Sequence, residues 1–118
     1  MDHKQLDVWK VSMELVTLIY KITNTFPKTE QYGLTNQIRR SVVSIPSNIA
    51  EGSGRNGWKE LHQFLGYSIG SAAELDTQIL IAKNLNYIDA KSVELVLEKI
   101  EKVRKLLSGY KKYVRTKF

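Results

Sequence analysis

Apolar residues recur at helical spacing between residues 33 and 55, and this pattern constrains the fold more than any other feature of the chain. Steps of 3 and 4 place them on one face of a helix, formed by Leu34, Ile38, Val42, Ile45 and Ile49. A neighbouring face carries small polar groups at the same spacing: Gln37, Ser41, Ser44 and Asn48. We expect a helix over residues 35–51, with Thr35 as a cap and Gly52 at its end.

Pro46 falls inside this pattern. A proline within a helix removes one backbone donor, and its ring presses on the carbonyl four residues earlier, here that of Val42. The sequence therefore predicts one helix that is kinked at Pro46, with the hydroxyls of Ser44 and Ser47 available to freed carbonyls. The alternative ends the helix at Ser44 and makes residues 46–52 a loop.

Three further helices are expected from the same periodicity, over about residues 6–25, 57–84 and 90–113. Pro27 stops the first, while Asn56 and Asp89 are suitable caps for the other two. No stretch alternates apolar and polar residues as a half-buried strand does. Because short connections make successive helices antiparallel neighbours, we predict an all-α fold, an up-down-up-down four-helix bundle forming a single domain over residues 1–118.

The first helix is apolar over well over half of its circumference, more than an ordinary surface helix. Either it sits deep in the bundle or it covers an interface with another copy, and we favour self-association. The expected interface residues are Trp9, Met13, Val16 and Tyr20. The helix at 57–84 has small residues in its middle, from Gly66 to Ala73, which predicts close approach of a neighbouring helix, most naturally the first one.

Composition limits the class of protein. The hydrophobic fraction of 42% suits a packed core, and no apolar run approaches the roughly 18 residues of a membrane span. Cysteine is absent, which excludes disulfides and thiol chemistry, and the first residues lack the apolar segment of a secretory signal. We therefore expect a cytoplasmic protein without a membrane partner.

The formal net charge of +6 is concentrated at one end of the chain. Residues 99–118 hold eight Lys and Arg residues against Glu101 alone, so this segment carries +7 and the other 98 residues carry −1. A cluster of this kind is typical of a protein that contacts phosphates, and Tyr110 and Tyr113 could stack on bases. The candidate contacts are Lys102, Arg104, Lys105, Lys111, Lys112, Arg115 and Lys117. The alternative is that cations simply suit a helix C-terminus and the tyrosines pack.

Three further groups of residues are weaker candidates. Arg39 and Arg40 could extend the basic surface, or pair with Glu51 or Glu74 inside the bundle. Gly52, Gly54 and Gly57 have dinucleotide-binding spacing but follow a helix rather than a strand, which leaves only a phosphate held by backbone amides and Arg55. A third group is expected to form a buried polar network: Gln37, Ser41, Asn48 and Glu51.

Catalytic and metal sites are not expected. The only histidines are His3 and His62, and His62 does not share a helix face with Glu60. The Glu-x-x-His pairs of carboxylate-bridged metal bundles are missing. We predict no catalytic residue, no cofactor and no metal, and a substrate-sized pocket with convergent titratable groups would contradict that prediction.

Nearly the whole chain, about residues 6 to 110, resembles the 23S rRNA-intervening-sequence proteins, also called four helix bundle proteins. The most specific match is the run Ser44 to Gly52, SIPSNIAEG. Further matches are Val8-Trp9, Ile19-Tyr20, Phe26-Pro27, Tyr32-Gly33-Leu34, Gln37-Ile38-Arg39-Arg40, Phe64-Leu65, Ser71 and Glu74-Leu75. A similar fold occurs in the accessory protein of diversity-generating retroelements, a homopentamer that binds nucleic acid and a reverse transcriptase. The resemblance implies a bundle, a homopentamer and a role with nucleic acid, and it supplies no catalytic residue.

We therefore expect a non-enzymatic, homo-oligomeric bundle that binds RNA or DNA backbone through basic helix ends, as an accessory to a larger machine. The alternative is a structural or protein-interaction module whose basic surface meets an acidic protein partner.

Overall fold

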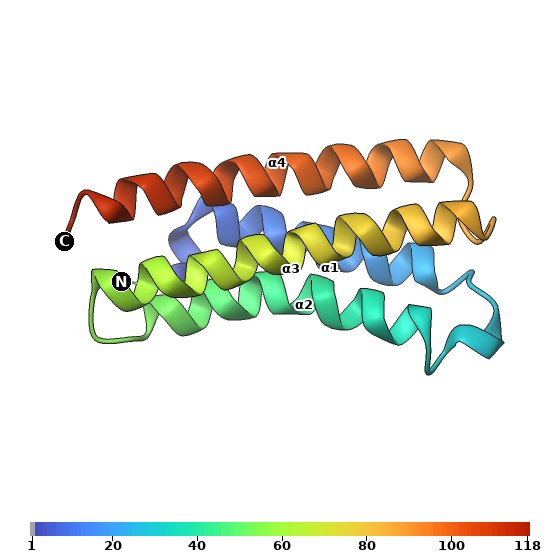
Figure 1. Cartoon of the computed structure of the whole chain (residues 1–118), viewed down its shortest axis with the longest axis horizontal. Coiled ribbons are helices and arrows are strands. Elements are labelled where there is room, and N and C mark those ends of the chain that lie inside the picture. Colours follow the sequence, from blue (N-terminus) through green and yellow to red (C-terminus); the bar gives the residue numbers. More distant parts are fainter. Residues whose placement is uncertain (1) are drawn as a thin grey trace.

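Four long helices make up most of the computed structural model, which describes residues 2–118. They are α1 (Asp7–Thr23), α2 (Leu34–Ser53), α3 (Trp58–Asn84) and α4 (Ala90–Arg115). Two short 3-10 helices, η1 (His3–Gln5) and η2 (Lys28–Glu30), precede α1 and α2. The helices run side by side along one long axis, and successive helices reverse direction (Figure 1). The predicted all-α four-helix bundle is confirmed, and no strand occurs in the described part of the chain.

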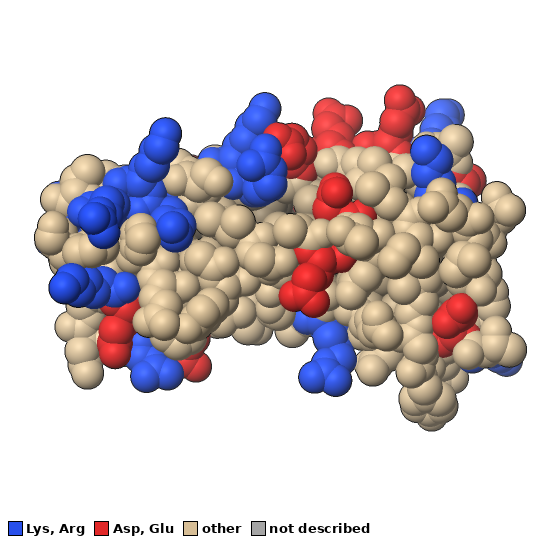
Figure 2. Space-filling view, in the orientation of Figure 1, with Lys and Arg blue, Asp and Glu red and all other residues tan. Residues whose placement is uncertain are grey.

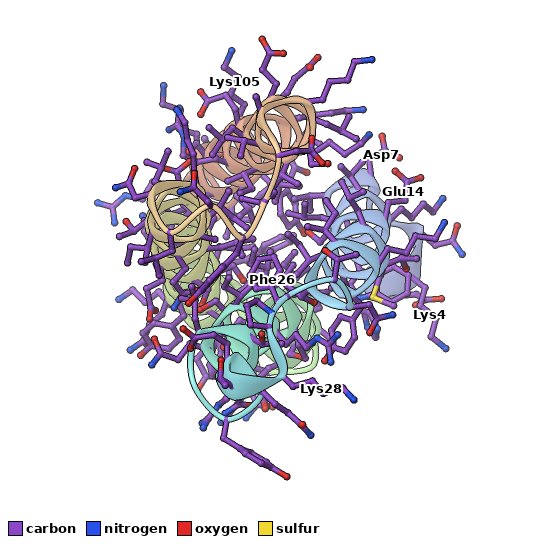
Figure 3. All side chains as sticks on the ribbon, turned by 90° about the vertical axis from the view of Figure 1, so that its right-hand side faces the viewer. Lys4, Asp7, Glu14, Phe26, Lys28 and Lys105 are labelled. Carbon is purple, nitrogen blue, oxygen red and sulfur yellow. The ribbon has the colours of Figure 1, made fainter. Side chains whose placement is uncertain are left out.

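Each long helix packs against two others. α2 and α4 both pack beside α1 and α3, whereas α1 and α3 are not neighbours and occupy opposite corners of the bundle (Figure 3). The predicted contact between α1 and the small residues of α3 is therefore wrong. Ser68, Ser71 and Ala72 are buried on α3, but a Cβ added to Gly70 would meet nothing within 4 Å. The buried small residues of α3 therefore belong to its packing with α2 and α4, not with α1.

The core is one continuous cluster of mainly aliphatic side chains from all four helices, with Phe26 and Ile88 added from the connections. Leu15, Ile38, Leu75 and Val103, one from each helix, are completely or almost completely buried. Burial of such a side chain stabilises the fold by about 1.5–3 kcal/mol. The apolar spacing of 34–49 therefore describes the buried face of α2 correctly, because its five members all belong to this core.

Helix α2 continues through Pro46, so the alternative in which it ends at Ser44 is wrong. Side chains of α3 bond to α2 at the two residues just before the proline: Ser68 Oγ donates to the Ile45 carbonyl at 2.8 Å, and the hydroxyls of Ser44 and Ser71 share a short hydrogen bond. The Ser44 hydroxyl thus joins two helices instead of serving a freed carbonyl of its own helix. The kink at Pro46 stays a prediction.

The caps differ from expectation at two of three helices. Asp89 caps α4 as predicted, since its Oδ1 accepts from the Ser92 amide at 2.8 Å. Thr35 does not cap α2; it is buried inside the helix, and Glu30 Oε1 accepts from the Leu34 amide at 3.1 Å. At α3 the N-cap position is Gly57 rather than Asn56. A carboxylate of a neighbouring turn replaces the expected polar cap at α2.

No helix within residues 2–118 is both long and apolar enough to cross a membrane.

Candidate nucleic-acid interface

The C-terminal turns of α4, the start of α3 and the connection between α2 and α3 all lie at one end of the bundle (Figure 1). We call the cations gathered here the basic end: Arg55, Lys111, Lys112, Arg115 and Lys117. Figure 2 shows Lys and Arg side chains concentrated toward this end of α3 and α4, with acidic side chains nearer the middle of the same face. The positive charge that the sequence places near the C-terminus thus gathers at one end of the bundle, where some acidic side chains also lie at the lower left of Figure 2.

A groove of about 410 Å³ runs between α3 and α4 at the basic end. Its lining combines cations with small and apolar groups: His62, Ile69, Ser108, Lys111, Lys112 and Arg115. Gly66 lies beneath the stem of Lys111, since a Cβ there would be 3.6 Å from Lys111 Cε. The groove therefore presents a cationic edge to whatever enters it.

The cations of the groove are not neutralised by carboxylates. The ion pairs among residues 2–118 join Arg55 to Glu51 at 3.1 Å and Arg104 to Glu101. Lys111, Lys112, Arg115 and Lys117 therefore form no ion pair with a described residue. Partial burial, together with the charges of Lys111 and Arg115, lowers the pKa of His62. An anion in the groove would relieve this mutual repulsion.

Aromatic side chains surround the same cations. The Trp58 and Tyr113 rings meet edge to face with centroids 6.5 Å apart, and Tyr110 lies nearly parallel to Tyr113 at 6.2 Å. Lys117 Nζ lies 5.0 Å from the centre of the Tyr113 ring. Burial raises the pKa of Tyr110, as does the neighbouring Tyr113 to a lesser degree. The sequence analysis named Tyr110 and Tyr113 as residues that could stack on bases. Only the fold shows that Trp58 lies beside Tyr113.

A second aromatic contact flanks the groove. The ring of Phe118 meets His62 edge to face at 5.4 Å, and the guanidinium carbon of Arg115 lies 5.0 Å from the centre of the Phe118 ring. Sequence reasoning missed Phe118 and assigned no role to His62. The available signal was the short connection between α3 and α4, because it makes these helices antiparallel and so places the start of α3 beside the end of α4.

The other predicted contacts on α4 lie farther from its C-terminus. Arg104 forms a two-pronged pair with Glu101 and lowers the pKa of that carboxyl. Lys105 lines a hollow between α1 and α4 that also includes Asp7, and both residues are labelled in Figure 3. Lys102 is exposed. These three residues add positive charge nearer the middle of α4, but they are not part of the basic end.

Arg39 and Arg40 do not join the basic end, because the start of α2 lies at the opposite end of the bundle (Figure 1). Arg39 Nε donates to Thr23 Oγ1 at 2.9 Å, and its Nη2 donates to Asn24 Oδ1 at 3.1 Å. It therefore ties the start of α2 to the end of α1, and it forms no ion pair with a glutamate of the described residues. Contact of Arg39 or Arg40 with nucleic acid stays a prediction.

The connection between α2 and α3 holds a small hollow of about 160 Å³ lined by Gly52, Gly57 and Trp58 among others. Arg55 at its edge bonds Glu51 and lies 5.0 Å from the centre of the Phe64 ring. A phosphate site at this connection stays a prediction.

The buried polar network predicted on α2 is wrong in its membership. Gln37 and Glu51 are exposed, because they lie on the outer side of the helix. The side chains that do bond α2 to α3 are Ser44, Ser68 and Ser71. Asn48 Nδ2 donates to the carbonyl of Ser44 at 2.9 Å, which places it beside the Ser44–Ser71 bond.

The predicted interface on α1 is only partly covered within one chain. Met13 and Tyr20 are 41% and 39% exposed, whereas Trp9 and Val16 are half-buried against the core. α1 therefore does not sit deep in the bundle, and part of its apolar surface remains open.

No cluster of three or more His, Asp or Glu side chains able to hold a metal ion occurs among the described residues.

A family model described as 23S rRNA-intervening sequence protein matches residues 4–109. The structure is also similar to a crystal structure of a protein of unknown function from the S23 ribosomal protein family of Bacteroides thetaiotaomicron, with a TM-score of 0.80 and 23% sequence identity. The similarity covers 89% of this chain and 98% of that one, and at this identity it bears on the fold alone. No curated protein matches the chain at a significant level.

Proposed function

From the premise that the chain belongs to the 23S rRNA-intervening sequence protein family, we propose that it is a non-enzymatic, homo-oligomeric bundle that binds the backbone of RNA or DNA. The basic end supplies the contacts, and the protein acts in the cytoplasm as an accessory to a larger machine. A phosphate backbone is the ligand that most directly suits a cluster of lysines and arginines without base-reading elements.

The observation that carries this proposal is the set of four cations at the end of α4 without carboxylate partners. Among residues 2–118 only Arg55 and Arg104 form ion pairs, so the distinguishing feature is that residues 110–118 gather four cations with no acidic residue among them. Lys111, Lys112, Arg115 and Lys117 form no ion pair within residues 2–118, and the first three line the groove with His62. Their charge is available to a polyanion.

Self-association strengthens the proposal, because each copy brings its own basic end and raises the local positive potential. The open part of the α1 surface, including Met13 and Tyr20, supports an interface between copies. The count of five subunits comes from the family resemblance.

Nucleic-acid binding is tested with a fluorescent structured RNA and a matched DNA across a salt series. We expect the affinity to fall steeply with salt, because bound phosphates release counterions. Changing Lys111, Lys112, Arg115 and Lys117 together to alanine removes four contacts and is expected to weaken both the affinity and its salt dependence.

The matched control removes the same charge from the opposite end by changing four exposed lysines to alanine: Lys21, Lys28, Lys83 and Lys91. An equal loss in both variants would mean that net charge, not the basic end, attracts the ligand. Absence of binding at low salt would overturn the proposal and direct the search to an acidic protein partner.

The oligomer is tested by light scattering on the wild type and on Met13→Glu. The wild type is expected at five times the 13.5 kDa mass of the chain, and the variant at a smaller assembly, because the interface would bury an unpaired carboxylate. A monomeric wild type would overturn the proposed assembly.

A further inference from the structure

The last two turns of α4 carry different chemistry on different flanks. Lys111 and Arg115 line the groove toward α3. Tyr110, Tyr113 and Lys117 follow one another at steps of 3 and 4 on another flank, so they share one side of the helix. Lys112 also lines the groove, with Lys111 and Arg115. One short segment therefore carries a cationic flank at the groove and an aromatic flank with Lys117 beside it.

The ring of Tyr113 is both fixed and accessible. Trp58 meets it edge to face from α3, and Tyr110 lies nearly parallel to it from the preceding turn. The side chain nevertheless remains 50% exposed. A ring that is oriented by its neighbours and open to solvent is a ready platform for stacking, because little side-chain freedom is lost on binding.

We propose that the basic end binds single-stranded nucleic acid, with bases stacked on Tyr113 and Trp58 and phosphates held by Lys111, Lys112, Arg115 and Lys117. This inference rests on the proposed function and names its ligand class. A duplex stacks its bases on one another and offers mainly phosphates to a surface without base-reading elements, so an exposed aromatic platform adds nothing to duplex binding. Single strands offer both phosphates and open base faces.

The contact between Lys117 and Tyr113 does not prevent a base from stacking on the Tyr113 ring. The ammonium lies over the ring at 5.0 Å and is not held by a carboxylate among the described residues. An exposed cation–π contact is weak, so Lys117 can move to a phosphate while a base takes its place on the ring.

The footprint of one copy is short. Residues 111 to 115, the last of α4, rise about 6 Å along its axis, which corresponds to about two stacked nucleotides. Tight binding of a longer strand therefore requires basic ends from several copies.

The experiment uses Trp58 as the reporter, in a Trp9→Phe background that leaves it as the only tryptophan. The probes are a single-stranded RNA and a single-stranded DNA of about 12 nucleotides, and the DNA duplex of the same sequence. Both single strands are expected to quench Trp58 fluorescence on binding, whereas the duplex binds without quenching.

The variants are Tyr113→Ala and Tyr113→Phe. The alanine variant is expected to weaken single-strand binding about tenfold and to leave duplex binding unchanged, while the phenylalanine variant retains the ring and the affinity. If the alanine variant loses its fold in a thermal melt, the quenching of Trp58 in the unaltered Tyr113 protein still decides the question.

Binding of all three probes without quenching, and without an effect of Tyr113→Ala, would overturn this inference and leave the proposed function standing. Failure of all three probes to bind would overturn both.

Discussion

The guanidinium carbon of Arg39 lies 4.5 Å from the centre of the Tyr20 ring, which places an α2 cation over an exposed aromatic of α1. The same guanidinium donates to Thr23 and Asn24 at the end of α1. Arg39 therefore fastens the connection between the first two helices and covers part of the proposed interface on α1. Its role in the fold is established by these contacts, independently of any ligand.

Arg39→Ala is expected to lower the free energy of unfolding by about 1–2 kcal/mol, because it removes charge-assisted hydrogen bonds and the contact with Tyr20. Urea unfolding measures this change. Arg40→Ala is the control, since Arg40 is exposed and forms no ion pair within residues 2–118, and its effect is expected within about 0.5 kcal/mol. Equal effects of the two substitutions would contradict the structural assignment.

Two glycines give opposite predictions for the same substitution. At Gly52 an added Cβ would lie 2.7 Å from Phe64 Cβ and 3.3 Å from Leu61 Cα, so Gly52→Ala forces α2 and α3 apart. We expect a loss of about 1–3 kcal/mol. At Gly70, inside α3, the Cβ meets open space, and Gly70→Ala is expected to stabilise by about 0.5–1 kcal/mol. Thermal unfolding of the two variants side by side tests the pair, and a common sign would refute it.

Glu30 makes stability depend on pH. Its carboxylate accepts from the Leu34 amide at 3.1 Å and from the Tyr87 hydroxyl at 2.9 Å. The backbone bond and, second, the Tyr87 bond lower the pKa of Glu30 from its ordinary value of 4.5. Because the unfolded chain then takes up the proton more readily, this stabilisation is complete above pH 4.5 and is lost as pH falls through the folded-state pKa.

The measurement is urea unfolding of the wild type and of Glu30→Gln between about pH 3 and pH 6. Glu30→Gln cannot titrate at this position, so its stability is expected to fall less steeply with acid. Parallel profiles would show that other carboxyls account for the slope.

The helices could be predicted because burial of one helix face requires apolar residues at steps of 3 and 4, and this spacing is visible in the sequence. Each predicted end lies within two residues of the observed one, including the end of α2 beyond Pro46. The caps were less predictable, since Thr35 was expected where Glu30 supplies the acceptor. Local sequence shows which side chains are able to cap, but not which one reaches the free amide.

The small residues of α3 did not allow a correct prediction of which helices are its neighbours in the bundle. Gly66 and Gly70 suggested close contact with α1, yet α1 and α3 lie at opposite corners. The basic end could be predicted only in part, because the sequence does not show which helices lie side by side. The cations of α4 are neighbours in sequence, but Trp58 and His62 reach them only because α3 begins where α4 ends.

His62 couples nucleic-acid binding to pH. Burial is the main cause that lowers its pKa in the free protein, and the charges of Lys111 and Arg115 on α4 add to it. A phosphate in the groove favours the charged imidazole, so the complex takes up a proton and its affinity rises as pH falls below neutrality. We expect His62→Gln to bind with less pH dependence, measured by anisotropy between about pH 5.5 and pH 8. His3→Gln, which alters the other histidine on η1, is the control and is expected to retain the wild-type profile. The same profile in the wild type and in His62→Gln would show that His62 does not face the bound phosphates.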